Sequence, residues 1–154
     1  MSTQDWSVIH SSNRHDWRTP PDLFERLDAE FGFQIDLAAS PENAKCDVFL
    51  TVEDDSLGID WVSLDKRSAW LNPPYGRDIG KWIDKAIEQS KRGMLVVMLV
   101  FACTDTKWWA RAWKNAAEVR FVSGRLSFLD HDGRKVNAAP KGSALLVFGP
   151  RYTA

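Results

Sequence analysis

The sequence has few cysteines and few histidines, and it has no long apolar run. Only two cysteines, Cys46 and Cys103, occur in 154 residues, which excludes a disulfide framework and a four-cysteine zinc site. The three histidines, His10, His15 and His131, show no ligand spacing, so no metal is expected. No stretch approaches the roughly 20 apolar residues of a membrane span, and the N-terminus lacks a signal-peptide pattern. We therefore expect a cytoplasmic protein that binds no membrane.

The sequence also has almost no net charge, but its charged residues are unevenly distributed along the chain. The net charge is −1, with 44% hydrophobic and 27% charged residues, an ordinary composition for one globular domain. Residues 1–76 carry 6 Lys and Arg against 14 Asp and Glu, whereas residues 77–154 carry 14 against 7. This asymmetry indicates a basic surface for a polyanion, or charges that folding interleaves; both interpretations stay open.

Strands and helices are expected to alternate through most of the chain. Residues 1–16 are polar without a period and are predicted to form a flexible arm, and residues 17–150 to form the domain. Thr19 is the expected N-cap of a helix that ends at Gly32. Either Thr104 or Asp105 is the expected N-cap of a later helix, and Trp113 is expected on the buried face of that helix. A further helix follows Ile79, and the expected strands cover 33–39, 47–50, 68–71, 94–102, 119–122, 125–128 and 144–148.

This order predicts a single-domain α/β fold, Rossmann-like and mainly parallel. The last two segments, 125–128 and 144–148, are expected to close the sheet as an antiparallel hairpin. Ligands of such sheets bind outside the carboxyl ends of the strands. Two motifs follow predicted strands at such ends, DLAA at 36–39 and NPPYG at 72–76.

The NPPY motif joins rigid acceptors to an aromatic ring. The Asn72 side chain offers a carbonyl oxygen and an amide group, while Pro73 and Pro74 fix the backbone and remove two donors. Tyr75 adds a ring face, and Gly76 permits a tight exit into the next helix. Such a loop suits a planar substrate that bears an –NH2 group. An ordinary strand-to-helix turn is the alternative, but the position after a buried strand favours function.

An ordered series of motifs extends this hypothesis. The following motifs occur in order over about residues 16–149: WRTPPDLFERLDAEFGFQIDLAAS, NAKC, EDDSL, AWLNPPYG, DTKWW, and GRLSF with PKGSALLVF. In this series the sequence resembles the phage-type DNA N-6-adenine methyltransferases, the Dam family, which use S-adenosylmethionine. The resemblance implies a compact methyltransferase fold that acts on double-stranded DNA in the cytoplasm of a bacterial host.

The resemblance also implies roles for individual residues. The expected catalytic residues are those of NPPY, with Tyr75 stacking on an adenine flipped out of the duplex and Asn72 and Pro73 accepting hydrogen bonds from its amine. One of two adjacent acidic residues is expected to bind the ribose or adenine edge of the cofactor. The full set of expected cofactor-binding residues is Trp17, Thr19, Pro20, Asp36, Leu37, Ala38, Ala39, Asp54 and Asp55.

Two departures from the family pattern concern the cofactor loop and DNA recognition. DLAASPEN contains no glycine, so the glycine-rich loop of many methyltransferases is missing. No separate target-recognition domain is expected, because only 36 positions separate Asp36 from Asn72. Sequence specificity then comes from segment 124–143, from the N-terminal arm, or from a second subunit of a homodimer. Arg77, Arg125 and Lys141 are the expected contacts to DNA.

Two other functions stay open from the residues alone. The acceptor could be another planar amine, the exocyclic amine of cytosine or the amide of a protein glutamine. Alternatively, the chain could be a non-catalytic DNA-binding subunit with a methyltransferase fold. Neither cysteine follows a proline, which disfavours the ring-carbon cytosine methyltransferases that attack with a thiolate.

Overall fold

The computed structural model describes residues 19–130, 132, 134–135, 139 and 141–150. The predicted arm and Trp17 lie outside these residues. The elements, in chain order, are α2 (Pro21–Phe31), β1 (Ile35–Asp36), the 3-10 helices η2 (Val52–Asp54), η3 (Ser56–Gly58) and η4 (Trp61–Leu64), β2 (Ser68–Leu71), α3 (Ile79–Lys91), β3 (Leu95–Phe101), α4 (Lys107–Asn115), β4 (Glu118–Phe121) and β5 (Ser143–Phe148). Among the described helices, none has the length and apolar character to cross a membrane.

The five strands form one sheet in the order β1-β2-β3-β5-β4. β1, β2 and β3 pair in parallel, and β5 pairs antiparallel with both β3 and β4. Four strands therefore run in one direction and only β5 runs against them, which confirms the predicted α/β fold with a mainly parallel sheet. The carboxyl ends of β1, β2 and β3 consequently meet at one edge of the sheet.

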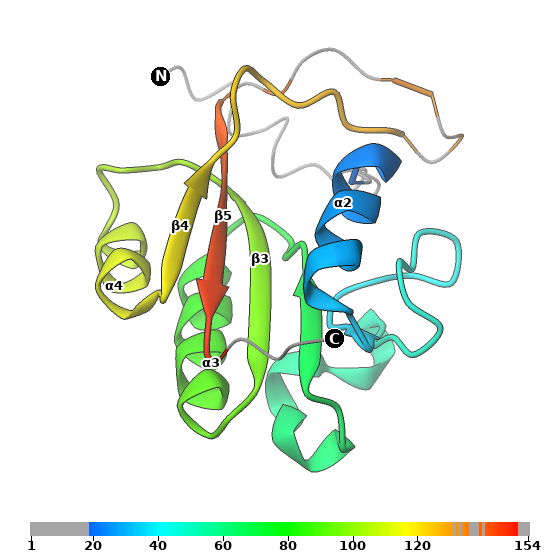
Figure 1. The fold of residues 1–154 in the computed structure, drawn as a ribbon, viewed down its shortest axis with the longest axis vertical. Coiled ribbons are helices and arrows are strands. Elements are labelled where there is room, and N and C mark those ends of the chain that lie inside the picture. Colours follow the sequence, from blue (N-terminus) through cyan, green and yellow to red (C-terminus); the bar gives the residue numbers. More distant parts are fainter. Residues whose placement is uncertain (1–18, 131, 133, 136–138, 140, 151–154) are drawn as a thin grey trace.

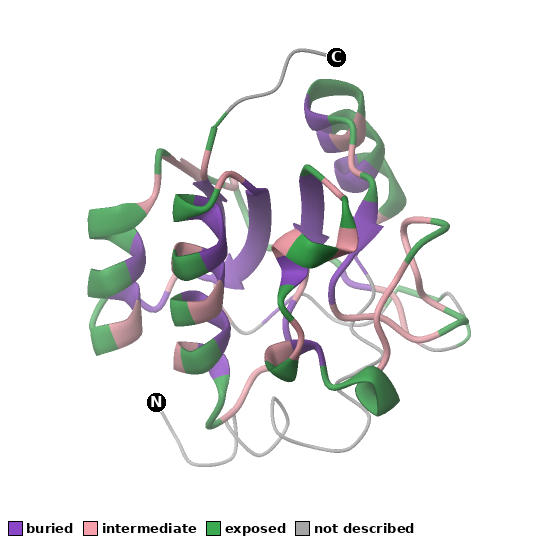
Figure 2. Ribbon diagram, turned by 90° about the horizontal axis from the view of Figure 1, so that it is seen from below, coloured by how far each residue is buried: buried purple, intermediate pink, exposed green. Residues whose placement is uncertain are grey.

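Helices cover both faces of this sheet (Figures 1 and 2). α3 and α4 pack on one face and α2 packs on the other. β3 is buried along its whole length, with Val96 and Met98 directed to the α3 and α4 side and Leu95 and Val97 to the α2 side. Because both faces are covered, the strand is a continuous apolar run rather than an alternating one.

The start of α2 differs from the prediction. The residue at the N-cap position is Pro20, and no side chain caps the helix, so the expectation that Thr19 is the cap is wrong. The Thr19 hydroxyl instead accepts a hydrogen bond from Asn72. The predicted end is confirmed, since Gly32 has φ 63°, a left-handed conformation that glycine adopts without strain.

The first two predicted strands are shorter than expected. Of residues 33–39 only Ile35–Asp36 form a strand, because the Asp36 carboxylate accepts hydrogen bonds from the backbone N–H groups of Ala38 and Lys45 and turns the chain away. Segment 47–50 contributes one parallel bridge, between Asp36 and Phe49. Backbone hydrogen bonds from Asp36 N to Val48 O and from Leu50 N to Asp36 O hold this segment beside the end of β1.

The sheet ends in an antiparallel pair as predicted, but the partner of β5 is β4 and not segment 125–128. β5 lies between β3 and β4, so both of its edges are already paired. The connection from β4 to β5 passes from the α4 side across the top of the sheet toward α2 (Figure 1). Its Phe128 is buried in the core on the α2 side, with its ring centroid 6.3 Å from that of Phe101.

The last predicted helix also needs two corrections. Thr106, rather than Thr104 or Asp105, caps α4, since its side chain accepts from the N–H of Trp109. Trp113 is 61% exposed, although the helical pattern placed it in the core. α4 buries only a narrow stripe, Trp109 and Ala112, because it covers the edge of the sheet above the short strand β4.

Candidate active site

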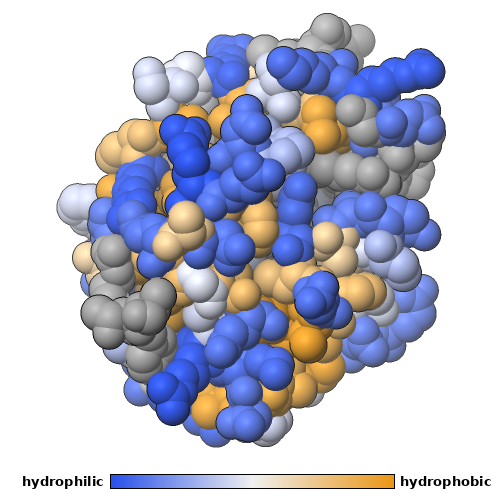
Figure 3. Space-filling model, turned by 45° about the vertical axis from the view of Figure 1, so that its right-hand side comes forward, coloured by the Kyte–Doolittle hydropathy of each residue, from blue (hydrophilic) through white to orange (hydrophobic). Residues whose placement is uncertain are grey.

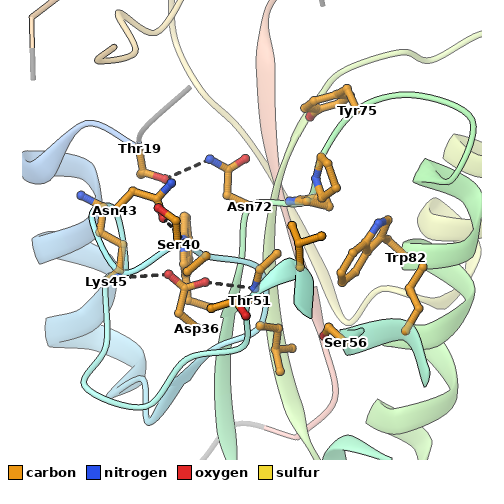
Figure 4. A pocket seen from close by; sticks show the side chains of 18 of the residues that line it. Thr19, Asp36, Ser40, Asn43, Lys45, Thr51, Ser56, Asn72, Tyr75 and Trp82 are labelled. Carbon is orange, nitrogen blue, oxygen red and sulfur yellow. Dashed lines mark hydrogen bonds between the residues drawn. The ribbon is translucent and has the colours of Figure 1, made fainter. Parts of the chain in front are cut away.

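A cavity of about 330 Å³ opens at the edge where β1, β2 and β3 end. This volume lies within the range of small-molecule and cofactor sites. Figure 4 shows side chains from the ends of β1 and β2, from η3 and from α3 around it. The lining residues are Thr19, Asp36, Leu37, Ala38, Ala39, Ser40, Asn43, Lys45, Thr51, Val52, Asp55, Ser56, Leu57, Trp70, Asn72, Pro73, Pro74, Tyr75, Asp78, Trp82, Phe101 and Phe128.

The side-chain amide of Asn72 has a defined orientation in this cavity. Its Nδ2 donates a hydrogen bond to Thr19 Oγ1 at 3.2 Å, and Thr19 itself is only 2% exposed. The amide oxygen consequently lies on the side away from Thr19 and toward Tyr75 (Figure 4). The amide oxygen of Asn72, a hydrogen-bond acceptor, is therefore directed into the space between Asn72 and Tyr75.

Tyr75 is held from both its ring and its hydroxyl group. The backbone N–H of Phe101, the last residue of β3, donates to the tyrosine hydroxyl, and the two ring centroids lie 4.4 Å apart at 32°. Burial raises the pKa of Tyr75 well above its usual value of 10, so the hydroxyl stays neutral. Gly76 then has φ 143°, a conformation that L side chains rarely adopt, and this lets the chain turn into α3.

Asp36 brings a buried carboxylate to the end of β1. It is 3% exposed, and it accepts hydrogen bonds from Ala38 N at 3.2 Å and Lys45 N at 3.0 Å (Figure 4). Desolvation by burial raises the pKa of Asp36 to about 6, against the lowering effect of these two bonds and of the Lys45 charge. The carboxylate is a costly group to bury and its charge is available to a cationic ligand.

The adjacent Asp54 and Asp55 have different surroundings. Asp54 Oδ2 accepts from the N–H of Thr51 at 2.7 Å and from its hydroxyl at 3.1 Å, so Asp54 closes the turn of η2 on itself. Asp55 has φ 51° and lines the cavity. A side chain on Gly58 would meet Asp55 Oδ2 at 2.7 Å, and this glycine therefore leaves room for the Asp55 carboxylate.

The structure brings most of the predicted cofactor and catalytic residues to one cavity. Pro20 and Asp54 do not line it, and Trp17 lies outside the described residues. The predicted DNA contacts do not line the main cavity. Arg77 is exposed and lines a second cavity, Lys141 Nζ lies 3.5 Å from Cys103 Sγ in the lining of that second cavity, and Arg125 is exposed and lines neither cavity. The residues that do line the main cavity as predicted are Thr19, Asp36, Leu37, Ala38, Ala39, Asp55, Asn72, Pro73, Pro74 and Tyr75.

Sequence reasoning missed four aromatic walls of the cavity. Trp82 belongs to the apolar face of α3, which indicated only a core position, and Phe101 ends a fully apolar strand. Trp70 lies within β2, and Phe128 was expected in a strand. Each of the four is buried and lines the cavity. No periodic signal separates a core side chain from one at the boundary between core and cavity.

Neither thiol is ionised at neutral pH. Burial raises the pKa of Cys46 to about 12 and also raises the pKa of Cys103. Within the part of the chain that the structure describes, no three His, Cys, Asp or Glu side chains come together as a metal site. The polar side chains that line the cavity carry carboxylates, amides and hydroxyls, together with the ammonium group of Lys45.

Comparison with known proteins identifies the family. The model of the DNA N-6-adenine-methyltransferase (Dam) family matches residues 6–153. The chain belongs to this family. The Dam-family match extends over nearly the whole sequence and confirms the resemblance seen in the ordered motifs.

Two Dam-family relatives come from phages. The DNA N-6-adenine-methyltransferase of Escherichia phage T1 is 34% identical over 149 residues, which cover 85% of this chain and 61% of that protein. The DNA N-6-adenine-methyltransferase of Haemophilus phage HP1 is 30% identical over 150 residues, which cover 94% of this chain and 84% of that protein. This chain thus spans about three fifths of the T1 protein. A solved SAM-dependent O-methyltransferase from Thermotoga maritima is 9% identical, with a TM-score of 0.47 over 99% of this chain and 74% of that one.

Proposed function

We propose that this Dam-family chain transfers a methyl group from S-adenosylmethionine to the exocyclic amine of adenine in duplex DNA, in the cytoplasm of a bacterial host. One observation supports this most directly. The acceptor loop 72–75 and the carboxylates of Asp36 and Asp55 line the same cavity, so a methyl donor and an amine would meet there. The family match supports adenine as the base.

The lining of the cavity fits S-adenosylmethionine. Three carboxylates, those of Asp36, Asp55 and Asp78, line it against one cation, Lys45, and a cofactor with a sulfonium and an amino group carries positive charge. Alanines follow β1 where the backbone must approach a ligand, in place of the missing glycines. When bound, S-adenosylmethionine supplies an electrophilic methyl group. Asp55 is the acidic residue that we assign to the cofactor, because Asp54 bonds to Thr51.

The catalytic work of the chain is to position the amine. Asn72 Oδ1 and the Pro73 carbonyl oxygen accept hydrogen bonds from the two N–H groups of the adenine amine. These bonds direct the nitrogen lone pair toward the methyl group that is transferred. The hydrogen bond from Asn72 to Thr19 fixes which arm of the amide is the acceptor. The Tyr75 ring supplies a stacking face for the flipped base. No covalent enzyme intermediate is needed.

Methyl-labelled S-adenosylmethionine and unmethylated duplex DNA test this function. Nucleoside analysis of the product should show label in N6-methyladenine; label only in methylcytosine or in protein would overturn the assignment. Asn72→Ala should lower kcat at least 100-fold, which is the typical effect of removing one pre-organised polar group at a reacting centre. It should leave calorimetric binding of S-adenosylmethionine largely intact. Asn115→Ala, at an exposed asparagine that does not line the cavity, is the matched control and should keep full activity.

A further inference from the structure

A second cavity, of about 470 Å³, lies beside the first and shares Tyr75 with it as a wall. It is formed where the chain leaves NPPY to begin α3 and where it leaves β3 to begin α4, so it opens at the same edge of the sheet. Its lining residues are Tyr75, Gly76, Arg77, Ile79, Gly80, Cys103, Lys107, Trp108 and Arg111. The expected function of the NPPY loop does not account for this cavity.

The charge of the second cavity has one sign. Arg77, Lys107 and Arg111 line it, and none of its lining residues is acidic. Among the described residues Arg77 and Lys107 form no ion pair, whereas Arg111 binds Asp84 through Nε at 2.7 Å and Nη2 at 3.4 Å. Arg77 and Lys107 are therefore the two cations of this cavity whose charges are available to an anion.

The second cavity also contains apolar and aromatic surface. Trp108 is partly buried, unlike the exposed Trp113 on the same helix. Gly80 of α3 faces α4, since a Cβ atom there would lie 3.1 Å from Arg111 Nη2 and 3.8 Å from Trp108 Cβ. A sugar or base can contact the indole while a phosphate meets the cations, the combination by which proteins hold a nucleic-acid strand.

We propose that the second cavity is a subsite for the phosphodiester and sugar next to the target adenine. This inference rests on the proposed function. An adenine in the main cavity stays attached to its own strand, and Tyr75 is the wall between the two cavities, so the adjoining nucleotide passes the second cavity. Arg77 and Lys107 neutralise its phosphate, and Trp108 packs against the sugar. The subsite holds the strand in place without reading its sequence.

The double variant Arg77→Gln/Lys107→Gln tests this subsite. It should raise KM for duplex DNA at least 10-fold, lower the slope of log KM against log salt by about 1, because one phosphate is no longer neutralised, and leave the calorimetric Kd for S-adenosylmethionine within twofold. Lys91→Gln/Lys114→Gln is the matched control, because it removes two exposed cations from the C-terminal turns of α3 and α4, away from the second cavity. An equal salt slope in both double variants would overturn the proposal.

A chemical change in the DNA separates this inference from the proposed function. Each phosphate on either side of the methylated adenine is replaced in turn by an uncharged methylphosphonate. At one position the wild-type protein should lose at least fivefold in kcat/KM and Arg77→Gln/Lys107→Gln should lose less than twofold. Equal losses in both proteins at every position would show that the cations contact no flanking phosphate, although transfer to DNA stands. A wild-type protein that methylates no DNA overturns both proposals.

Discussion

Thr19 and Asn72, 53 positions apart in the chain, are joined by a hydrogen bond of 3.2 Å from Asn72 Nδ2 to Thr19 Oγ1. The bond connects Thr19, which precedes the N-cap residue Pro20 of α2, to the residue after β2. It thereby ties the helix on one face of the sheet to the acceptor loop. Because the amide nitrogen is used in this bond, the amide oxygen is presented on the opposite side of the side chain (Figure 4).

Thr19→Val should lower kcat about three- to tenfold. The substitution keeps the volume of the buried side chain but removes the acceptor for Asn72 Nδ2, and one such hydrogen bond contributes about 1 kcal/mol. Thr19→Ser, which keeps the hydroxyl, should restore most of kcat. Steady-state kinetics with saturating cofactor measure both, and a valine variant with wild-type kcat would contradict the orienting role.

Asp54 and Asp55 should respond differently to the same isosteric change. Asp55→Asn removes a charge from the cavity and should raise the Kd for S-adenosylmethionine about 10-fold or more, as expected for a hydrogen bond to a charged group. Asparagine tolerates the left-handed backbone of this position. Asp54→Asn keeps an oxygen that can accept the Thr51 N–H, so it should leave Kd nearly unchanged and lower the free energy of unfolding by less than about 1 kcal/mol. Calorimetry and urea titration distinguish the two.

Gly58→Ala provides an independent check of Asp55. The added methyl group would lie 2.7 Å from Asp55 Oδ2, so the carboxylate has to move although no charge is changed. The Kd for S-adenosylmethionine should rise severalfold. If Gly58→Ala binds the cofactor normally while Asp55→Asn does not, the position of the carboxylate is less important than its charge.

The site could be predicted from the sequence where it follows strands. DLAA and NPPY each come directly after an apolar strand-like segment, and because the strands are parallel their carboxyl ends share one edge. Asp36 and Asn72 are therefore brought to one cavity without any long-range information. The buried run 94–102 was recognisable for the same reason, since a strand covered on both faces needs no alternation.

The features that could not be predicted from the sequence depend on competition between distant segments of the chain. Segment 125–128 has strand-like residues, but β3 and β4 already pair with both edges of β5, so Phe128 packs in the core instead. The Thr19 hydroxyl could cap a helix or accept from Asn72, and only the folded arrangement decides between them. Trp113 has helical spacing with Trp109, yet the narrow sheet under α4 leaves it exposed.

Tyr75→Phe should separate the structural role of the hydroxyl from the role of the ring. The hydroxyl accepts the N–H of Phe101 at the end of β3, and its loss should lower the free energy of unfolding by about 1 kcal/mol while kcat stays within threefold. Tyr75→Ala removes the stacking face as well and should lower kcat/KM roughly 10- to 100-fold, the value of one base–aromatic contact. A phenylalanine variant as inactive as the alanine variant would assign the hydroxyl to catalysis.

The raised pKa of Asp36 predicts how stability changes with pH. Its carboxyl has a pKa of about 6 in the folded chain, against a usual value of 3.8, so between these values the folded state binds more protons than the unfolded state. The stability that protonation provides is fully present below pH 4 and is lost as the pH rises through 6. The difference of about two pKa units corresponds to about 3 kcal/mol.

Urea titrations between pH 4 and pH 7 measure this effect against Asp36→Asn, which cannot ionise. The wild-type free energy of unfolding should fall by about 3 kcal/mol relative to that variant over this range. Asp65→Asn, the same change at an exposed carboxylate with a left-handed backbone, should follow the wild type throughout. A constant difference between wild type and Asp36→Asn from pH 4 to pH 7 would mean that Asp36 ionises normally in the folded chain, and that its burial at the end of β1 has no electrostatic cost.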